Sequence, residues 1–284
     1  MTETSNALAS FVDNIAARAE RHACREDEYT GEDGLLHCKK CDGRRETVIN
    51  IFGQERVVRC VCKCTRDEEE ARKAIQRKEA QERRRRICFQ GTNMAGWSFE
   101  NDDRQRPELS DAMAKYAENF TEYIKTGQGL LLYGPKGTGK TYLAACIANR
   151  VIDLGHRAYM TNFSQAVNNL QATFEKQEYK DDLCSYDLLI IDDLGTERKS
   201  EFMQEQVFNI IDARYRSGLP LIVTSNLTSD ELGKPGTIEA GRIYDRILER
   251  CLPVKVEGES RRRQAAKTSW EHMRAQLGME AARK

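Results

Sequence analysis

The eight residues from 134 to 141 read Gly-Pro-Lys-Gly-Thr-Gly-Lys-Thr. They follow a short apolar run, 130–133, and precede a segment, 142–148, with the composition of a helix. Glycines allow a backbone to curl until several N–H groups face one anion. The N-terminus of the following helix adds partial positive charge. In this order of strand, turn and helix the pattern predicts a phosphate-binding loop rather than a glycine-rich turn that matches by chance.

Two side chains of the loop are expected to act directly on a bound nucleotide. Lys140 can reach the β- and γ-phosphates as a point charge, and the Thr141 hydroxyl can bind Mg²⁺. We therefore expect ATP and Mg²⁺ as ligands. The predicted nucleotide-binding residues are Gly134, Pro135, Lys136, Gly137, Thr138, Gly139, Lys140 and Thr141.

A second group of polar residues follows two later apolar runs. Asp192 and Asp193 come directly after 188–191. Asn226 is the second residue after the next apolar run, 221–224. We expect Asp192 to enter the Mg²⁺ shell, Asp193 to polarise an attacking water, and Asn226 to contact that water or the γ-phosphate. Because strands alternate with helices here, the chain is predicted to be α/β, with a parallel sheet that binds ligands at its carboxyl edge.

Three arginines lie beyond these strands. Arg242, Arg246 and Arg250 are spaced four residues apart, so they share one face of a predicted helix. Such residues usually form a solvated stripe. The alternative is an arginine finger that reaches the γ-phosphate of a neighbouring subunit.

Cysteines dominate the N-terminal part of the chain. Cys38 and Cys41 form a Cys-x-x-Cys pair, and Cys60, Cys62 and Cys64 follow a segment rich in β-branched residues. This spacing is typical of a zinc ribbon, in which four thiolates close a tetrahedron and leave no position for a catalytic water. We predict a structural Zn²⁺ held by Cys38, Cys41, Cys60 and Cys62, with Cys64 as the substitute for Cys62. Free surface thiols are the alternative interpretation.

Composition limits the partners and the compartment. The 284 residues carry a formal net charge of +0, so any contact with DNA must come from a local patch. The first ten residues lack the pattern of a signal peptide, and no apolar stretch approaches the ~20 residues of a membrane helix. We therefore predict a cytoplasmic protein with no membrane contact. In a reducing compartment, clustered cysteines favour metal binding over disulfides.

The composition also changes along the chain. Residues 1–64 are predicted to hold an N-terminal helix and the zinc-binding module. Residues 65–90 begin with acids and end with arginines, a distribution that suits the dipole of a charged linker helix. Residues 91–284 have the alternating pattern of an ATPase domain.

The order of motifs in residues 97–268 resembles that of the DnaC-like replicative helicase loaders. These are AAA+ ATPases similar to transposon helper ATPases. The shared motifs are the phosphate loop, Leu-Leu-Ile-Ile-Asp-Asp-Leu-Gly, Thr-Ser-Asn, Arg-Ile-Tyr-Asp-Arg-Ile and Glu-Ser-Arg-Arg. The resemblance implies an AAA+ P-loop sheet flanked by helices. It also assigns Lys140 and Thr141 to the phosphate loop, Asp192 and Asp193 to the acidic pair, Asn226 to the first sensor, Arg246 to the finger, and Arg262 (or Arg261) to the second sensor.

One departure from the AAA+ pattern concerns Asp193, which stands where most members have Glu. Its side chain is one methylene shorter, so we expect slow hydrolysis without partners.

The resemblance implies an ATP-dependent loader whose partners are a replicative DNA helicase, single-stranded DNA and further copies of itself, with ATP between subunits. Phe174, Lys176, Arg198 and Lys199 are candidates for a DNA-facing surface that combines stacking with charge. The alternatives are a transposition helper that acts on a transposase and a nucleotide-gated interaction protein with incidental hydrolysis.

Overall fold

The computed structural model describes residues 25–195, 201–234 and 236–279. The chain divides into two compact units, Met1–Glu79 and Ala80–Lys284, which we describe separately. The helix expected near the N-terminus, around Leu8 and Phe11, lies outside the described residues.

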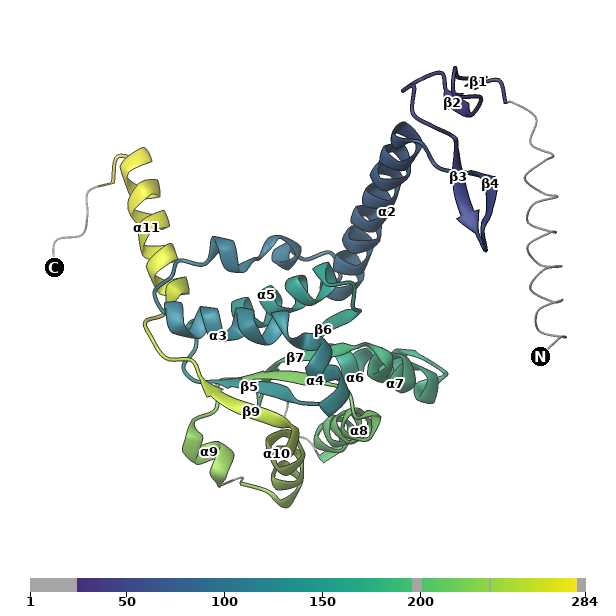
Figure 1. The fold of residues 1–284 in the computed structure, drawn as a ribbon. Helices are drawn as coiled ribbons and strands as arrows, with labels where there is room; N and C mark the ends of the chain where they lie inside the picture. Colours follow the sequence, from purple (N-terminus) through teal and green to yellow (C-terminus); the bar gives the residue numbers. More distant parts are fainter. Residues whose placement is uncertain (1–24, 196–200, 235, 280–284) are drawn as a thin grey trace, which may run out of the picture. The chain divides into compact units, whose positions relative to one another are not determined.

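The first unit is built from two antiparallel hairpins and the start of a long helix (Figure 1). Their bounds are β1 (Glu28–Thr30), β2 (Leu36–Cys38), β3 (Glu46–Ile51), β4 (Gln54–Arg59) and α2 (Lys63–Phe89). Phe52 and Gly53 close the second hairpin with φ values of 52° and 84°. Two consecutive residues with positive φ are typical of a type I′ turn, whose twist matches that of the flanking strands. The buried Glu28 accepts hydrogen bonds from Arg59 at 2.7 and 3.1 Å, which join the two hairpins.

The helix α2 spans the stretch predicted as a linker, and the boundary between the two units falls inside it, after Glu79. Its last turn belongs to the second unit. Cys88 and Phe89 are buried in the core of that unit, and Nε of Arg85 donates to Oδ1 of Asn149 at 3.1 Å. The C-terminal end of the helix is therefore part of the packed domain.

The second unit contains a parallel sheet with the strand order β6-β7-β8-β5-β9. The strands are β5 (Gly129–Tyr133), β6 (Ala158–Asn162), β7 (Leu188–Leu194), β8 (Leu221–Ser225) and β9 (Cys251–Lys255). Leu131, Leu132, Ile190 and Ile191 are buried whichever face they point to. Continuous apolar strands of this kind are typical of a parallel sheet covered on both sides. The predicted fold class is confirmed.

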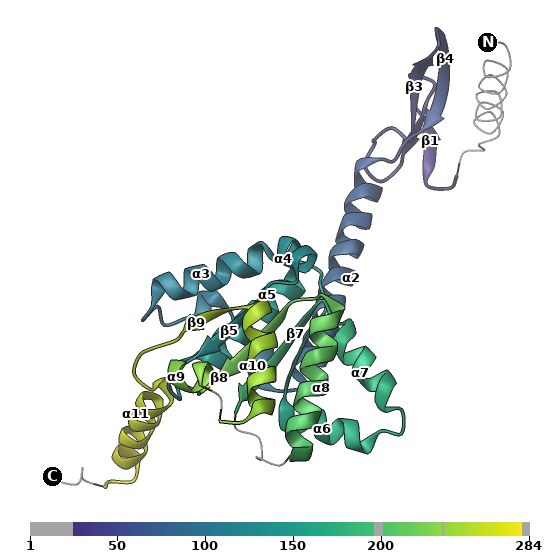
Figure 2. The ribbon, with the colours of Figure 1, turned by 90° about the horizontal axis from the view of Figure 1, so that it is seen from below.

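Helices cover both faces of the sheet (Figures 1 and 2). The α-helices after α2 are α3 (Pro107–Glu118), α4 (Phe120–Thr126), α5 (Lys140–Asp153), α6 (Phe163–Ala172), α7 (Lys176–Ser185), α8 (Glu201–Ser217), α9 (Ser229–Gly233), α10 (Ile238–Arg250) and α11 (Arg261–Gln276). Of these, α11 has no buried residue and does not cover the sheet. One core lies under α3, α4, α5 and the end of α2, and the other under α6, α7, α8 and α10. Asn119 separates α3 from α4. Among the described residues, no helix combines the length and the apolar character that crossing a membrane requires.

A buried arginine fixes the edge of the second core. The Arg214 side chain is 1% exposed and donates to the backbone oxygens of Cys184, Tyr186, Asp187 and Pro220, at distances from 2.5 to 3.1 Å. Burial lowers the pKa of Arg214 to about 10. The guanidinium thus joins the end of α7 to the residue before β8 and satisfies carbonyls that would otherwise be buried without partners.

Candidate functional site

The predicted phosphate loop connects β5 to α5, as expected. Gly134, Gly137 and Gly139 have φ values of 138°, 84° and 100°, which favour glycine over any residue with a Cβ. A Cβ on Gly134 would also lie 2.5 Å from the carbonyl oxygen of Val256. The helix α5 starts at Lys140, so its unpaired N–H groups face the loop.

Lys140 lies at the floor of this loop with only 5% of its surface exposed. Its Nζ donates to the carbonyl oxygens of Gly134 at 2.8 Å and Pro135 at 2.7 Å. Burial lowers the pKa of the amine, while the carboxylates of Asp193 and Asp192 act in the opposite direction. The amine is therefore held inside the curve of the loop, where a phosphate group would meet it.

Asp192 and Thr141 are brought together from elements far apart in the sequence. The Thr141 hydroxyl donates to the carboxylate of Asp192 at 3.0 Å from Oδ1 and 3.2 Å from Oδ2. The Thr224 hydroxyl, on β8, donates to the same Oδ1 at 2.5 Å. Burial raises the pKa of Asp192, while the hydrogen bond from Thr224 acts to lower it. A hydroxyl beside a carboxylate is a fitting donor set for Mg²⁺, which binds hard oxygen ligands.

Asp193 has an uncommon backbone conformation, with a φ of 60°. The β7–β8 pairing shifts register between Ile191 and Leu194, so Asp193 lies in a bulge at the end of the strand. Its N–H donates to the Thr224 hydroxyl at 2.9 Å, and its Oδ1 accepts from the Asn226 amide at 3.0 Å. The bulge turns Asp193 toward the loop, where both it and Asn226 line the same pocket.

This pocket has a volume of about 510 Å³ and extends beyond the predicted residues. The sequence did not predict one wall of this pocket. It consists of residues from 97–103 and from the first turn of α5: Trp97, Asn101, Asp102, Asp103 and Tyr142. The rings of Trp97 and Tyr142 lie 5.5 Å apart, and the Tyr142 hydroxyl donates to the Ser98 carbonyl at 2.6 Å. Only the tertiary fold brings this segment to the loop, so no local motif could have identified it.

Arg261 and Arg262, at the start of α11, also line the pocket. Arg261 forms an ion pair with Asp103 at 2.8 Å, and its N–H donates to the Gly137 carbonyl at 2.9 Å. Ser260 caps the helix and lies so close to Gly137 that no side chain would fit there. The phosphate loop and α11 are therefore in direct contact.

Arg246 does not line this pocket. Its Nη2 forms an ion pair with Asp212 of α8 at 2.7 Å, and its guanidinium lies 4.8 Å from the ring centre of Tyr215. Arg250 packs on the same ring at 5.0 Å, whereas Arg242 is exposed and has no side-chain partner in the described part of the chain. A role for Arg246 at the site of a neighbouring subunit stays a prediction.

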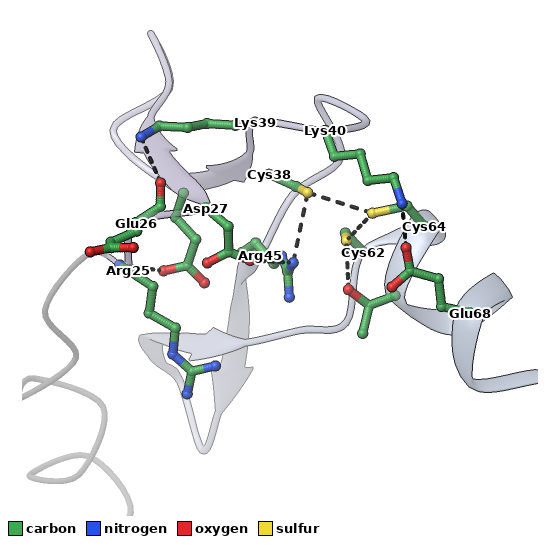
Figure 3. A network of polar contacts seen from close by, with 12 residues as sticks. Arg25, Glu26, Asp27, Cys38, Lys39, Lys40, Arg45, Cys62, Cys64 and Glu68 are labelled. Carbon is green, nitrogen blue, oxygen red and sulfur yellow. Dashed lines mark hydrogen bonds and ion pairs between the residues drawn. The ribbon is translucent and has the colours of Figure 1, made fainter. Parts of the chain in front are cut away.

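Four of the N-terminal cysteines form one cluster, three of which, Cys38, Cys62 and Cys64, are labelled in Figure 3. The sulfur atoms of Cys38, Cys41, Cys62 and Cys64 all lie within 4.8 Å of one another, close enough to hold a metal ion. Cys60, which we expected as a ligand, is not part of this cluster. Its N–H donates to the Arg45 carbonyl at 2.7 Å, which extends the β3–β4 ladder, and its thiol points to the Arg44 carbonyl at 3.3 Å.

The chemistry of this cluster suits a divalent metal with a preference for sulfur. Backbone N–H groups of Cys41 and Lys40 lower the pKa of Cys38 to about 6. The hydrogen bond with the Cys62 sulfur raises the pKa of Cys64 to about 12. A cation would relieve this competition between crowded sulfurs. Gly43 leaves room for the cluster, since a Cβ there would lie 3.2 Å from the sulfur of Cys41.

Known proteins similar to this chain fall into two groups. It is 28% identical over 207 residues to the replicative helicase loader DnaI of Bacillus subtilis, across 67% of this chain and 66% of DnaI. It is also 28% identical over 171 residues to a putative insertion sequence ATP-binding protein of Sinorhizobium fredii, across 58% of this chain and 57% of that protein. The chain thus spans about two thirds or less of the length of these two curated relatives.

Solved structures agree with the fold. A crystal structure of DnaI, 25% identical, superposes with a TM-score of 0.53 over 63% of this chain and 99% of that one. A crystal structure of the DnaC helicase loader, 20% identical, shares the fold with a TM-score of 0.51 over 58% of this chain and 100% of that one. The resemblance to DnaC-like loaders is confirmed. The family model of the IstB-like ATP binding proteins matches residues 65–269, which contain the whole phosphate loop and both acidic residues, and the chain therefore belongs to the IstB-like ATP binding protein family.

Proposed function

We propose that this protein is an ATPase that loads a replicative DNA helicase onto single-stranded DNA. The observation that carries the proposal is the pocket in which the phosphate loop meets two linked pairs, Thr141–Asp192 and Asn226–Asp193. A site that only bound nucleotide would need the loop but not a second acid held by an amide at the next strand tip. The names of the relatives DnaI and DnaC support the choice of a helicase as partner.

Each group in the pocket has a defined task in this proposal. The loop amides and Lys140 bind the phosphates, and Thr141 with Asp192 would hold Mg²⁺, which neutralises charge as the terminal phosphate leaves. Asp193 orients and polarises the attacking water, and Asn226 fixes the direction of its carboxylate. Trp97 and Tyr142, whose rings are tilted by 38° to each other, offer an aromatic wall for the adenine base.

A complete site would be shared between subunits. Arg262 contributes to its own pocket, and Arg246 is the proposed finger for the pocket of the next copy. Asp212 now holds the Arg246 guanidinium, so assembly would exchange an intramolecular ion pair for contact with phosphate. Because a trans arginine can contribute ~10³–10⁵ in rate, an isolated subunit would hydrolyse ATP slowly.

The cysteine cluster is proposed to bind one structural Zn²⁺ through Cys38, Cys41, Cys62 and Cys64. Four thiolates would complete the tetrahedral coordination of Zn²⁺. The bound metal would stabilise the fold of a unit that is too small for an extensive apolar core. We assign helicase capture to this N-terminal unit and ATP binding to the second.

A transposition helper is the second candidate function, because the insertion sequence relative matches over a similar length. The two candidates differ in their protein partner. Immobilised protein would be tested against a replicative helicase and a transposase, each with ATP and with ADP, followed by a fork-unwinding assay in which helicase must be loaded onto single-stranded DNA covered by binding protein. Capture of helicase and ATP-dependent unwinding are expected. If the protein captures only the transposase, the transposition-helper function would be favoured over the helicase-loader function.

A further inference from the structure

We propose that one face of α11 binds single-stranded DNA. The face consists of Arg263, Lys267, Trp270 and Arg274, spaced by four, three and four residues, so their side chains project from the same side of the helix. No residue of α11 is buried, and 61% of the Trp270 surface is exposed. A large aromatic ring between cations is the arrangement that binds bases by stacking and the backbone by charge. The inference rests on the proposed function and specifies the surface that would hold its DNA.

The cations of this face are available to a ligand. Arg263, Lys267 and Arg274 are exposed, and their side chains form no ion pair within the described part of the chain. Many other surface arginines are paired with acids, as Arg104 is with Asp111. Since the whole chain has a net charge of +0, this face is a local basic patch of the kind that DNA binding requires.

The composition of the face favours nucleic acid over a protein groove. Glu271 is the only acidic residue of α11 and lies at the edge of the face. Met273 and Leu277 are also exposed and lie on the other side of Trp270, but an apolar groove would leave the three cations beside the indole ring without partners. We therefore commit to single-stranded DNA, whose unpaired bases expose the flat surfaces that Trp270 can stack on.

The alternative surface around Phe174 fits DNA less well. Phe174 is fully exposed, but the neighbouring residues 175–182 contain four acids and two lysines. Negative charge beside the ring would repel phosphates. Arg198 and Lys199, predicted to complete that surface, lie outside the described residues.

The position of α11 connects this face to the nucleotide. Arg261, two residues before Arg263, donates its N–H to the Gly137 carbonyl of the phosphate loop and forms an ion pair with Asp103. A phosphate bound in the loop would therefore lie next to the backbone that contacts the first turn of α11. We expect the affinity for single-stranded DNA to differ between the ATP-bound and ADP-bound protein.

The test measures binding of the full chain to a fluorescein-labelled oligothymidylate by anisotropy, at several salt concentrations. Trp270→Ala should weaken binding about 5- to 150-fold, the range expected for losing one stacked base, and Trp270→Phe should restore most of it. The double variant Lys267→Gln and Arg274→Gln should reduce the slope of log K against log salt by about 1.4, because each lost phosphate contact removes about 0.7. Lys115→Gln is the matched control, since Lys115 is an exposed cation of α3 outside this face.

Helicase capture and ATP turnover are measured on the same variants. If the wild type binds the oligonucleotide and the α11 variants show the same affinity and salt slope, the inference is overturned. The proposed loader function would not be affected by that result. Loss of helicase capture with DNA binding preserved would also overturn the inference, because the face would then be a protein-docking surface. A wild type that captures no helicase would instead refute the proposed function, while weakened DNA binding by Trp270→Ala would still support the face.

Discussion

The side-chain amide of Asn226 donates a hydrogen bond to Oδ1 of Asp193 at 3.0 Å and so joins the tips of β8 and β7. Because Asp193 lies in a bulge, this bond fixes where its carboxylate points. We expect Asn226→Ala to lower ATP turnover about tenfold to hundredfold, a part of what a positioned base contributes, with ATP affinity nearly unchanged. Phosphate release and titration with a fluorescent nucleotide measure the two quantities. Unchanged turnover would exclude this orienting role.

Substitutions of Lys140 and Asp192 should cause different defects in nucleotide binding and turnover. Lys140→Ala removes a buried cation from the phosphate cradle, so ATP affinity should fall by about tenfold or more, as for other charged hydrogen bonds. Asp192→Asn keeps the cradle but removes the carboxylate expected to hold Mg²⁺, so binding should persist while Mg²⁺-dependent turnover is lost. Calorimetry and a turnover assay separate the two defects. Normal turnover in both variants would place the nucleotide site elsewhere.

Arg246 should act on the pocket of a neighbouring copy. Arg246→Ala and Asp192→Asn are each expected to be nearly inactive. A mixture should regain part of the activity, since some interfaces then pair an intact pocket with an intact finger. Arg242→Ala provides the control, as that arginine shares the helix but has no contact with Asp212. No recovery in mixtures whose assembly is verified by light scattering would argue against a shared site.

The zinc prediction separates two neighbouring cysteines. Elemental analysis should find one Zn²⁺ per chain, and X-ray absorption should give Zn–S distances of about 2.3 Å. Cys64→Ser should lose most of the metal, whereas Cys60→Ser should retain it, because Cys60 bonds to the Arg44 carbonyl outside the cluster. Equal loss in both variants would contradict this ligand set, and zinc-free wild type would contradict the site.

Arg214 should be essential to the stability of the second unit. Arg214→Met removes the guanidinium donor from the carbonyls of Cys184, Tyr186, Asp187 and Pro220, and we expect a cost of about 1–3 kcal/mol for each buried carbonyl that is left without a partner. Differential scanning calorimetry would show a clear fall in the unfolding temperature of that unit. The exposed Arg216→Met should change the unfolding free energy by about 0–1 kcal/mol. Similar shifts in the two variants would refute the role of Arg214.

The sequence was most informative where function depends on a continuous segment. The phosphate loop needs glycines at fixed positions between a strand and a helix, so its residues, and the order of elements around it, follow from the chain alone. Asp192, Asp193 and Asn226 were also identified, because parallel strands place their carboxyl ends at one edge of a sheet.

Other parts of the site depend on tertiary geometry that no spacing encodes. In the sequence, Thr224 cannot be distinguished from an ordinary strand residue. In the structure, its hydroxyl donates to Asp192 and accepts from the N–H of Asp193. The wall from Trp97 to Asp103 reaches the pocket only because the chain returns there after α2. The structure places Cys64 in the cluster and Cys60 outside it for a local reason. The strand pairing continues through Cys60, and the chain turns into α2 only after it.

The distribution of cysteines makes the two units chemically distinguishable. Cys88, Cys146, Cys184 and Cys251 are buried in the second unit, and burial raises the pKa of each, to about 12 for Cys146 and Cys251. The thiolate is the form of cysteine that attacks a thiol reagent, so these four sulfurs should resist labelling while the protein is folded. Among the described cysteines, a maleimide dye would then report only on the N-terminal unit. Metal release and helicase capture could be followed in the native chain without first removing a single cysteine from the ATPase.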